Sequence, residues 1–415
     1  MKKNIFFLLC IILLNLRVNL IGSISITELF VLTQIPKLWR WSNLLNFGLI
    51  RKIRKLFLYL IVSQFISELI IRNDIINLVK GIMITVMALF ILLFILYEII
   101  ERKVSILMVP IGLIIAQIAL GDQFGFADSG DSSVWFKFYV VPIVSNGICC
   151  LFLLNKKWIN HNVVLLFLIT AIFMMAFGSR TGGFTMLLSL ILYFIFNRKV
   201  NLTKWQILKV LIPALIILQL FYAFIYVPKI KSGDWGSEQN RAQMAAIDYS
   251  SNCLMLIMAA RSDFYVSTVA FMDEPLLGHG SWARDKDLKY AKISARLAEL
   301  DEMRVFEIAD RYGYPLIPMH SILVGMGARN GILSFVLFLY IFILIYKGSF
   351  KLLKVKPKHL PYICYLIVVS FQAVLFSPMA ILKNFVVVMW AVLLAYYYIN
   401  NKKYKNESTS CYCNL

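Results

Sequence analysis

The stretch RSDFYVSTVAFMDEPLLGHGSW (Arg261–Trp282), followed later by HSILVGMGARNGILSF (His320–Phe335), decides how this chain is organised. The first stretch lies inside a long polar segment that runs from about Val227 to Met319. On both sides of this segment the sequence consists mainly of apolar runs of about 20 residues, the length that a helix needs to cross a bilayer. We therefore expect one large folded loop between membrane-spanning helices, and we expect any chemistry to involve that loop.

The composition supports this class of protein. Hydrophobic residues make up 60% of the 415 residues, and the mean hydropathy is +0.77. A soluble protein this apolar would precipitate, whereas repeated apolar runs are what a bilayer requires. We predict an all-α polytopic membrane protein with about twelve transmembrane helices and one large, mainly helical periplasmic loop.

The expected spans follow from the apolar runs and from the charges that flank them. We place them near residues 4–20, 22–36, 56–72, 79–99, 104–120, 136–154, 162–177, 182–197, 206–227, 321–346, 360–377 and 379–398. Residues 1–227 thus hold nine spans, 228–319 the loop, 320–398 three spans and 399–415 a tail. Lysine and arginine gather in alternate connectors, and positive charge favours the cytoplasmic side. Both termini are therefore expected in the cytoplasm, and the loop in the periplasm.

The net charge of +20 does not indicate a nucleic-acid-binding protein. Between Val227 and Met319 there are 11 basic and 13 acidic residues, so the remainder carries 31 basic against 9 acidic. That excess lies in short connectors between apolar runs. This is the distribution of membrane topology signals and not of a groove for phosphate backbones.

Three features are expected inside the loop. Ser237–Met272 is rich in helix-forming residues. DEPLLGHGSW reads as a turn, because Pro275 ends one element and Gly278 and Gly280 permit a tight backbone. Ala283–Arg311 alternates charged and apolar residues, which suits an amphipathic helix on the membrane surface or over a cavity.

Arg180 is the first candidate for chemistry. It lies in GSRTGGFTMLL at the expected outer mouth of two spans, beside Gly182 and Gly183. An interfacial arginine often only extends its side chain to lipid phosphates. Alternatively, its fork could bind a pyrophosphate, with the glycines letting a ligand approach the backbone. The residues alone leave both interpretations open.

Further candidates lie in and beside the loop. Arg261 is either a solvated arginine paired with Asp263 or a ligand-binding one. His320 stands where the polar segment meets an apolar helix, and the ordinary pKa of a histidine, about 6.5, lets it accept a proton near neutrality. A lone histidine is more often structural, and His279 in the Gly-His-Gly turn has the same two interpretations. Arg284, in the same loop, is a further candidate for substrate binding.

Together these segments resemble the O-antigen ligase and Wzy-type O-antigen polymerase superfamily. Its members typically show S-R-G-G at the mouth of a span, an arginine upstream of P-L-x-G-x-G, and H-[NS] before a glycine-ended run into the next span. Here Arg180 lies in SRTGG, Arg261 precedes PLLGHG by 14 residues, and His320-Ser precedes Gly331 by eleven. The motifs cover about residues 178–346, and the rest of the chain is similar by topology only.

Three positions depart from the family pattern. Thr181 intrudes in the first motif, Val324 stands where a leucine is usual, and Arg329 occupies a position that is often acidic. These departures concern the subfamily and not the superfamily.

The resemblance implies a bacterial inner-membrane glycosyltransferase of lipopolysaccharide or surface-polysaccharide biosynthesis, acting at the periplasmic face. Its donor would be an oligosaccharide on undecaprenyl pyrophosphate, and it would need neither a cofactor nor a metal. Arg180 and Arg261 would stabilise the charge on the leaving pyrophosphate. His320 would accept the proton of the acceptor hydroxyl, with inversion at the anomeric carbon. Substrate-binding residues would be Arg180, Arg261, Gly182, Gly183, Arg284 and His279.

The expected partners follow from the same resemblance. They are the lipid-linked oligosaccharide, the bilayer, and, as candidates, a chain-length regulator and a flippase of the same pathway, with no nucleic acid. In agreement with metal independence, the first outer loop near Ile21–Ile24 has no Asp-x-Asp motif. The acidic residues of GDQFGFADSGD are a less favoured alternative ion site.

Several functions remain open. A polymerase transfers the growing glycan onto another lipid-linked repeat unit, whereas a ligase transfers the polymer onto lipid A core. The richness in Ile, Asn, Lys, Phe and Tyr suggests an AT-rich gene, as in many surface-polysaccharide clusters, and on that ground we favour the polymerase. A lipid-linked glycan transporter is a less favoured alternative, because transporters usually show related halves and broken spans near the midplane.

Overall fold

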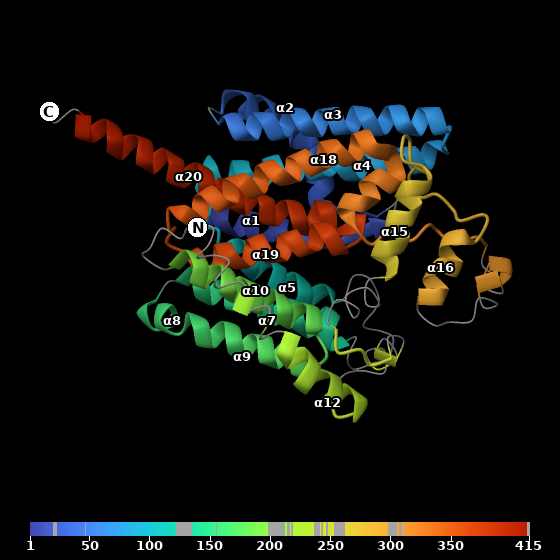
Figure 1. Ribbon diagram of the computed structural model, residues 1–415. Helices are drawn as coiled ribbons and strands as arrows, with labels where there is room; N and C mark the ends of the chain where they lie inside the picture. Colours follow the sequence, from blue (N-terminus) through green and yellow to red (C-terminus); the bar gives the residue numbers. More distant parts are fainter. Residues whose placement is uncertain are drawn as a thin grey trace.

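The structure is a computed structural model that describes residues 1–19, 23–45, 47–121, 135–154, 156–197, 212–213, 216, 219–235, 241, 244–245, 248–252, 262–297, 305–306, 309–311 and 313–412. Within these residues the chain is helical apart from one short hairpin and one isolated β-bridge (Figure 1). The elements of its first half are α1 (Lys2–Leu13), β1 (Arg17–Asn19), β2 (Ser23–Ser25), α2 (Ile26–Leu44), α3 (Gly48–Ile71), α4 (Ile75–Ile100), α5 (Met108–Leu120), η2 (Phe136–Val140), α7 (Val141–Leu154), α8 (Lys157–His161), α9 (Val163–Ala176) and α10 (Arg180–Asn197). The second half contains η3 (Tyr222–Tyr226), α12 (Val227–Lys231), α15 (Ser262–Asp273), α16 (Lys289–Leu297), α18 (Ile322–Lys354), α19 (Leu360–Phe376), η4 (Met379–Ile381), η5 (Leu382–Val386) and α20 (Val387–Tyr412).

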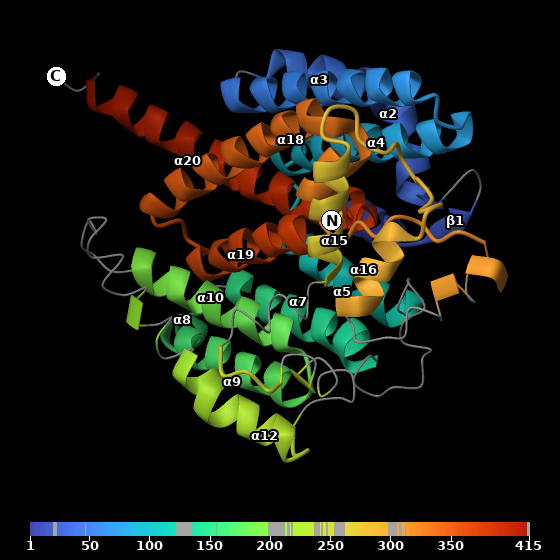
Figure 2. The ribbon, with the colours of Figure 1, turned by 45° about the vertical axis from the view of Figure 1, so that its right-hand side comes forward.

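Most of the long helices lie side by side in one bundle. The loop helices α15 and α16 lie at one end of it, and α8 lies at the other (Figure 1). Helix α15 runs across the bundle rather than along it, as a second view also shows (Figure 2). The apolar segment thus forms a scaffold, and the described part of the loop packs against one end of that scaffold.

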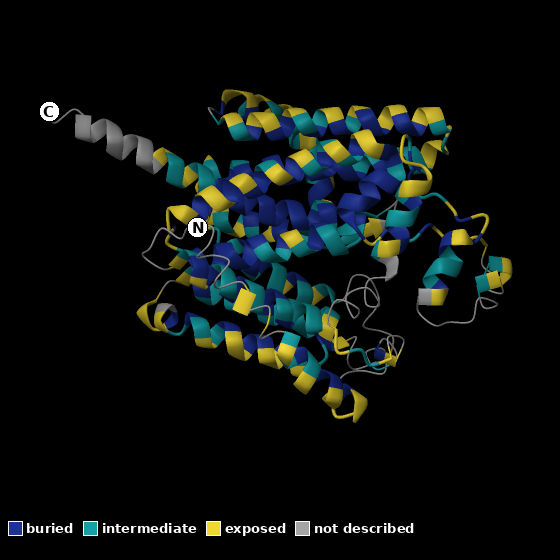
Figure 3. Ribbon diagram, viewed as in Figure 1, coloured by how far each residue is buried: buried dark blue, intermediate teal, exposed yellow. Residues whose placement is uncertain are grey.

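Helices α4 and α20 form the centre of the bundle. Nearly every residue of α4 from Met87 to Ile99 is buried, as is every residue of α20 from Val387 to Tyr396. Buried residues accordingly concentrate in the middle of the bundle and exposed ones on its outer helices (Figure 3). A helix that is apolar on all sides must be surrounded by other apolar groups, and the neighbouring helices provide them here.

Five helical segments within the described residues are long and apolar enough to cross a membrane. They are Ile75–Ile100, Phe136–Leu154, Arg180–Asn197, Ile322–Lys354 and Met379–Lys402. Three further apolar helices are shorter, namely Met108–Leu120, Val163–Ala176 and Leu360–Phe376. The structure is therefore that of an all-helical protein with several helices able to span a membrane. The expectation of twelve spans is not confirmed, because some apolar runs form short helices and the run at 206–227 lies partly outside the described residues.

The expected helical hairpin at residues 4–20 and 22–36 is corrected by the structure. Helix α1 ends at Leu13, and the chain then forms the antiparallel pair β1–β2 before α2 begins at Ile26. Ser25 starts α2 with a capping box: its Oγ accepts from Glu28 N–H (3.1 Å) and its N–H donates to Glu28 Oε2 (2.6 Å). The buried Glu28 carboxylate also forms an ion pair with Lys383, at 2.7 Å.

The amphipathic helix expected over Ala283–Arg311 is also corrected. Helix α16 covers only Lys289–Leu297, because the residues before it form a turn and an isolated bridge between Arg284 and Leu316. Asp285 is buried, and its Oδ2 accepts the backbone N–H of Ala291 at 2.7 Å, which binds the turn to the first residues of α16. Of the helix-rich stretch Ser237–Met272, the end lies in α15, residues 248–252 are not helical, and most of the remainder lies outside the described residues.

Candidate functional site

Helix α18 is broken two turns after it begins. Asn330 (φ −130°, ψ 17°) and Gly331 (φ 75°, ψ −176°) have non-helical backbone angles inside an otherwise continuous helix. Such a break removes hydrogen bonds between successive turns and leaves backbone groups that need other partners. These partners come from the loop.

The PLLGHG turn of the loop fills the break in α18. Its hydrogen bonds to α18 are His279 N–H to Ala328 O (2.8 Å), Gly280 N–H to Arg329 O (2.8 Å) and Ile332 N–H to Pro275 O (2.7 Å). Pro275 and the two glycines were expected to form a turn, and positive φ angles at Gly278 (74°) and Gly280 (86°) confirm that prediction. The two motifs are therefore in direct backbone contact.

The glycines of both motifs allow this close approach. A Cβ at Gly331 would overlap the backbone carbonyl of Leu276, and a Cβ at Gly278 would lie 2.5 Å from the carbonyl carbon of Arg329. These neighbours are backbone atoms, so they cannot turn away as a flexible side chain could. Any other residue at either position would push the turn out of the break.

A buried carboxylate from α3 hydrogen-bonds both the turn and the break in α18. Glu68 of α3 is 1% exposed, and its Oε1 accepts from the backbone N–H of Ser281 (2.8 Å) and from Asn330 Nδ2 (3.0 Å). Its Oε2 accepts from Asn73 Nδ2 at 2.6 Å. Asn73 Nδ2 also donates to Ser281 O, at 2.9 Å. Charge-assisted hydrogen bonds of this kind are stronger than neutral ones, so Glu68 fixes the turn and the break relative to α3.

Sequence reasoning did not identify Glu68. The signal was present, because Glu68 is the single charged residue in the run LYLIVSQFISELII, residues 58–71. An ionisable residue inside an apolar span is costly and usually has a specific partner. What the sequence could not indicate was that the partners lie in the loop and in α18.

A cavity of about 390 Å³ lies beside this junction. Its lining residues are Trp282, Ala283, Leu316, Ile317, Pro318, Met319, His320 and Arg329. The His320 side chain is exposed. An exposed imidazole at the edge of a cavity is accessible to a substrate, which is compatible with the role expected from the sequence.

Arg329 brings a cation into the same cavity. Its guanidinium carbon lies 5.5 Å from the centroid of the Trp282 ring, and its Nε lies 3.2 Å from Met319 Sδ. The contact with Met319 places Arg329 beside the segment that precedes α18. Sequence reasoning noted Arg329 only as a departure from the family pattern and gave it no role.

Arg284 lies near the same cavity. Its backbone forms a β-bridge with Leu316, one of the lining residues, and its Nη1 donates to Tyr314 O at 3.3 Å. The side chain is exposed. Its substrate-binding role stays a prediction, and its position next to the cavity is compatible with that role.

His279 belongs to a polar network within the loop. Its Nε2 lies 2.9 Å from Ala270 O and 3.1 Å from the hydroxyl of Tyr290. Because the Tyr290 hydroxyl donates to Asp273 Oδ2 (2.7 Å), His279 Nε2 must carry the proton that the carbonyl of Ala270 accepts. This bond gives His279 a structural role, and its contribution to substrate binding stays a prediction.

The network also predicts how the loop responds to pH. Hydrogen bonds from Lys289 and Tyr290 hold the pKa of Asp273 below its ordinary value. The link between α15 and α16 should therefore be complete above about pH 4, the ordinary range of an aspartate, and weaken as pH falls through the lowered pKa. The backbone amides of α16 should then exchange hydrogen faster at low pH, after correction for the intrinsic effect of pH on the exchange rate. An Asp273→Asn variant should show much less change, and an identical pH response in both proteins would contradict the prediction.

Arg180 is the first residue of α10 and faces the segment that leads into the loop. Its guanidinium carbon lies 5.9 Å from the centroid of the Tyr226 ring, and its side chain is half-buried. Gly182 and Gly183 have a packing role. A Cβ at Gly183 would lie 2.8 Å from the backbone oxygen of Ala171 in α9, and one at Gly182 would lie 3.1 Å from Val141 Cγ1. Ligand approach at these glycines stays a prediction.

Helix α19 connects the start of α10 with the start of α15. Thr185 of α10 hydrogen-bonds Gln372, and Phe264 of α15 packs against Phe376 with ring centroids 5.5 Å apart. Arg261 itself lies outside the described residues, but α15 begins directly after it. The helices that follow Arg180 and Arg261 therefore meet the same end of α19.

Helix α15 also contacts the segment that ends at His320. Ser267 Oγ donates to Pro318 O at 3.1 Å, and Met319 packs with Val266 and Ala270. Helix α15 thus connects the loop with the segment that lines the cavity and leads into α18. Within the described residues there is no group of three or more His, Cys, Asp or Glu side chains that could hold a metal ion.

Comparison with known proteins gives no family assignment. No protein-family model matches the chain, and a search of curated proteins finds no match.

Proposed function

We propose that the protein is an O-antigen polymerase, a glycosyltransferase that moves a growing glycan from undecaprenyl pyrophosphate onto a lipid-linked repeat unit. The observation that carries the proposal is the direct contact between the PLLGHG turn and the break in α18. These two segments carry motifs that resemble one superfamily, and they are separated by a polar stretch in the sequence. Beside this contact lies one cavity that His320 and Arg329 line, and Arg284 is bridged to Leu316 in its wall.

The chemistry of the transfer assigns a role to each residue type. The hydroxyl oxygen of the acceptor sugar attacks the anomeric carbon, whose bond to the pyrophosphate oxygen breaks with its electron pair going to the pyrophosphate. His320 takes the hydroxyl proton. Arg180 and Arg261 stabilise the negative charge that develops on the leaving group. Attack opposite the leaving group inverts the anomeric centre.

Arg329 is a further cation for this reaction. It shares the cavity of His320, whereas Arg180 lies near the start of α10 and Arg261 comes just before α15. A lipid pyrophosphate carries two phosphate groups, and more than one arginine fork is needed to bind both of them bidentately. We assign Arg329 to the binding of donor or acceptor phosphate next to the base.

Arg180→Lys and Arg261→Lys should each impair polymer formation even though the charge is kept. A lysine cannot form a bidentate fork, and loss of one hydrogen bond to a charged group corresponds to roughly 10- to 100-fold in rate. Length distributions of the polysaccharide made by each variant measure the effect. Arg241→Lys is the matched control, because this loop arginine donates to the Gly233 backbone carbonyl and belongs to no motif. Full activity of both motif variants would remove the proposed pyrophosphate role.

The proposed topology places the enzyme in the bacterial inner membrane, with about twelve spans, both termini in the cytoplasm and residues 228–319 in the periplasm. A reporter inserted at the exposed Lys286 should then give a periplasmic signal. One inserted at the exposed Lys356, in the basic connector after α18, should give a cytoplasmic signal. A cytoplasmic signal at Lys286 would overturn the topology and the proposed site with it.

Deletion of the gene tests the function itself. A polymerase deletion should leave lipopolysaccharide whose core carries a single repeat unit, and expression of this chain should restore the long polymer. Bare core, with polymer retained on the lipid carrier, would instead identify the ligase. Unchanged lipopolysaccharide and surface polysaccharide would contradict both enzymes.

A further inference from the structure

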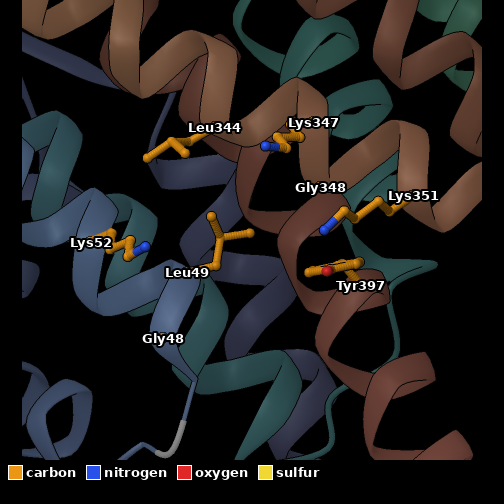
Figure 4. Close-up of a pocket in the computed structure, with 8 residues that line it drawn as sticks. All are labelled: Gly48, Leu49, Lys52, Leu344, Lys347, Gly348, Lys351 and Tyr397. Atoms are coloured by element: carbon orange, nitrogen blue, oxygen red, sulfur yellow. The ribbon is translucent and has the colours of Figure 1, made fainter.

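A second pocket lies at the end of the bundle opposite the loop. It has a volume of about 330 Å³ and is lined by Gly48, Leu49 and Lys52 of α3, by Leu344, Lys347, Gly348 and Lys351 of α18, and by Tyr397 of α20 (Figure 4). The start of α3 and the second half of α18 form this end, away from α15 and α16 (Figure 1). The pocket is therefore separate from the candidate site, and the reaction proposed above does not use it.

Three lysines direct their ammonium groups toward the centre of this pocket. Figure 4 shows Lys52 approaching from α3, and Lys347 and Lys351 from α18. The two lysines of α18 are four residues apart, so they lie on one face of the helix and repel each other. Within the described part of the chain none of the three forms an ion pair with an acidic side chain. An anion between them would relieve that repulsion.

Glycines provide the space that these lysines surround. A Cβ at Gly348 would lie 3.1 Å from Leu49 Cδ2, so α18 and α3 approach closely at that level. A Cβ at Gly48 would meet nothing within 4 Å, so the pocket is open there. Gly48 and Leu49 are also the first residues of α3, whose backbone N–H groups have no partner within the helix and lie on the same wall. The ring of Tyr397, packed 5.7 Å from that of Phe47, forms the opposite wall.

The surroundings of the pocket are apolar and exposed. On α3 the exposed side chains include Tyr59, Val62, Phe65 and Ile66, and on α18 they include Leu333, Val336, Tyr340 and Ile343. These residues continue from the pocket along the two helices, where they would face lipid in a membrane protein. A free inorganic anion would use only the lysines, whereas a phospholipid would use the lysines and the apolar surface together.

We propose that this pocket binds the phosphate headgroup of an anionic phospholipid, with the acyl chains lying along α3 and α18. Basic pockets between membrane helices on the cytoplasmic side bind anionic lipid headgroups in this way. The same lysines also fit the excess of positive charge that sets topology. A topology signal, however, needs only charge on the correct side, and it needs neither a pocket nor convergence of side chains from two helices.

Binding can be measured on the purified full-length protein in nanodiscs of phosphatidylcholine with increasing phosphatidylglycerol. The Lys52→Gln/Lys347→Gln/Lys351→Gln variant should bind phosphatidylglycerol at least about tenfold more weakly than the native protein, because each lysine near the surface contributes to the attraction. The matched control is Lys55→Gln/Lys354→Gln/Lys358→Gln. It removes the same charge from exposed lysines of the same region that do not line the pocket, and it should change binding less than about threefold.

A second variant tests the pocket without changing its charge. Gly48→Phe places a ring in open space and should block the headgroup, whereas Gly147→Phe, at another helical glycine with nothing within 4 Å, should not. The proposal would be overturned if the variant of the three pocket lysines and its control weakened binding equally. It would also be overturned if that variant and Gly48→Phe both bound phosphatidylglycerol as the native protein does. Inorganic phosphate that competes with phosphatidylglycerol at equal concentration would overturn it as well, because the site would then recognise a free anion. The pocket substitutions should leave the chain length of the polysaccharide unchanged when His320 is intact, so the two proposals fail independently.

Discussion

Replacing His320 by alanine is expected to abolish long-chain polysaccharide while leaving the protein inserted and folded. A general base contributes roughly 10²- to 10⁴-fold to a rate, so its loss should reduce the product to core with at most one repeat unit. The side chain is exposed, and an exposed substitution usually changes stability by no more than about 0.5 kcal/mol. The loss of activity can therefore be separated from a loss of fold. The measurement is the length ladder of lipopolysaccharide in a deletion strain that expresses the variant at native level.

A second histidine serves as the matched control. His161 is exposed, like His320, but it lies at the end of α8, on the opposite side of the bundle. His161→Ala should give a normal ladder. Normal chain length in His320→Ala as well would exclude His320 as the base and leave the cavity around Arg329 without a proton acceptor.

The sequence alone was sufficient to predict the features that depend on residues close together in the chain. The helices α9, α10 and α19 begin and end within about two residues of the apolar runs from which they were predicted, as expected for such runs. The turn at Pro275, Gly278 and Gly280 was predicted from residue types that have few other backbone options. Both predictions rest on local sequence, and the structure confirms both.

The errors arise where side chains override a local pattern. The capping box of Ser25 and Glu28 starts α2 later than the apolar run suggested, and it leaves room for the strand pair before it. In the loop, the alternation of charged and apolar residues predicted one helix from Ala283. The bridge between Arg284 and Leu316 replaces its first turns. In each case a specific hydrogen bond decides between structures that are otherwise close in propensity.

The candidate site was only partly predictable because its contacts are distant in sequence. Glu68 is separated by 213 residues from Ser281 and by 262 from Asn330, yet its carboxylate bonds both. Hydrophobic periodicity indicates local secondary structure, so it does not reveal hydrogen bonds between residues this far apart in the sequence. Arg329 lines the cavity of His320 directly before the break in α18, and the sequence gives no sign of that break, which the turn stabilises through backbone hydrogen bonds.

Glu68→Ala should release the PLLGHG turn from the break in α18 and abolish activity. The substitution leaves the N–H of Ser281 and the amide of Asn330 buried without their acceptor, and each unsatisfied group costs about 1–3 kcal/mol. That penalty is large compared with the free energy that holds a loop in place, which can approach zero for mobile segments. Hydrogen exchange should increase most at His279 and Gly280, whose N–H groups bond α18 in the native structure.

The conservative variant Glu68→Gln separates the hydrogen bonds from the charge. Its amide oxygen can still accept from Ser281 and Asn330, while the amide nitrogen would face Asn73 Nδ2, which must then rotate. We expect partial protection and partial activity from Glu68→Gln, and native behaviour from Glu101→Ala, which removes an exposed glutamate. If Glu68→Ala kept native exchange at His279 and Gly280, the carboxylate would not be what holds the turn. The backbone bonds between the turn and α18 would then be sufficient by themselves, and the glycines at positions 278 and 331 would carry the whole junction.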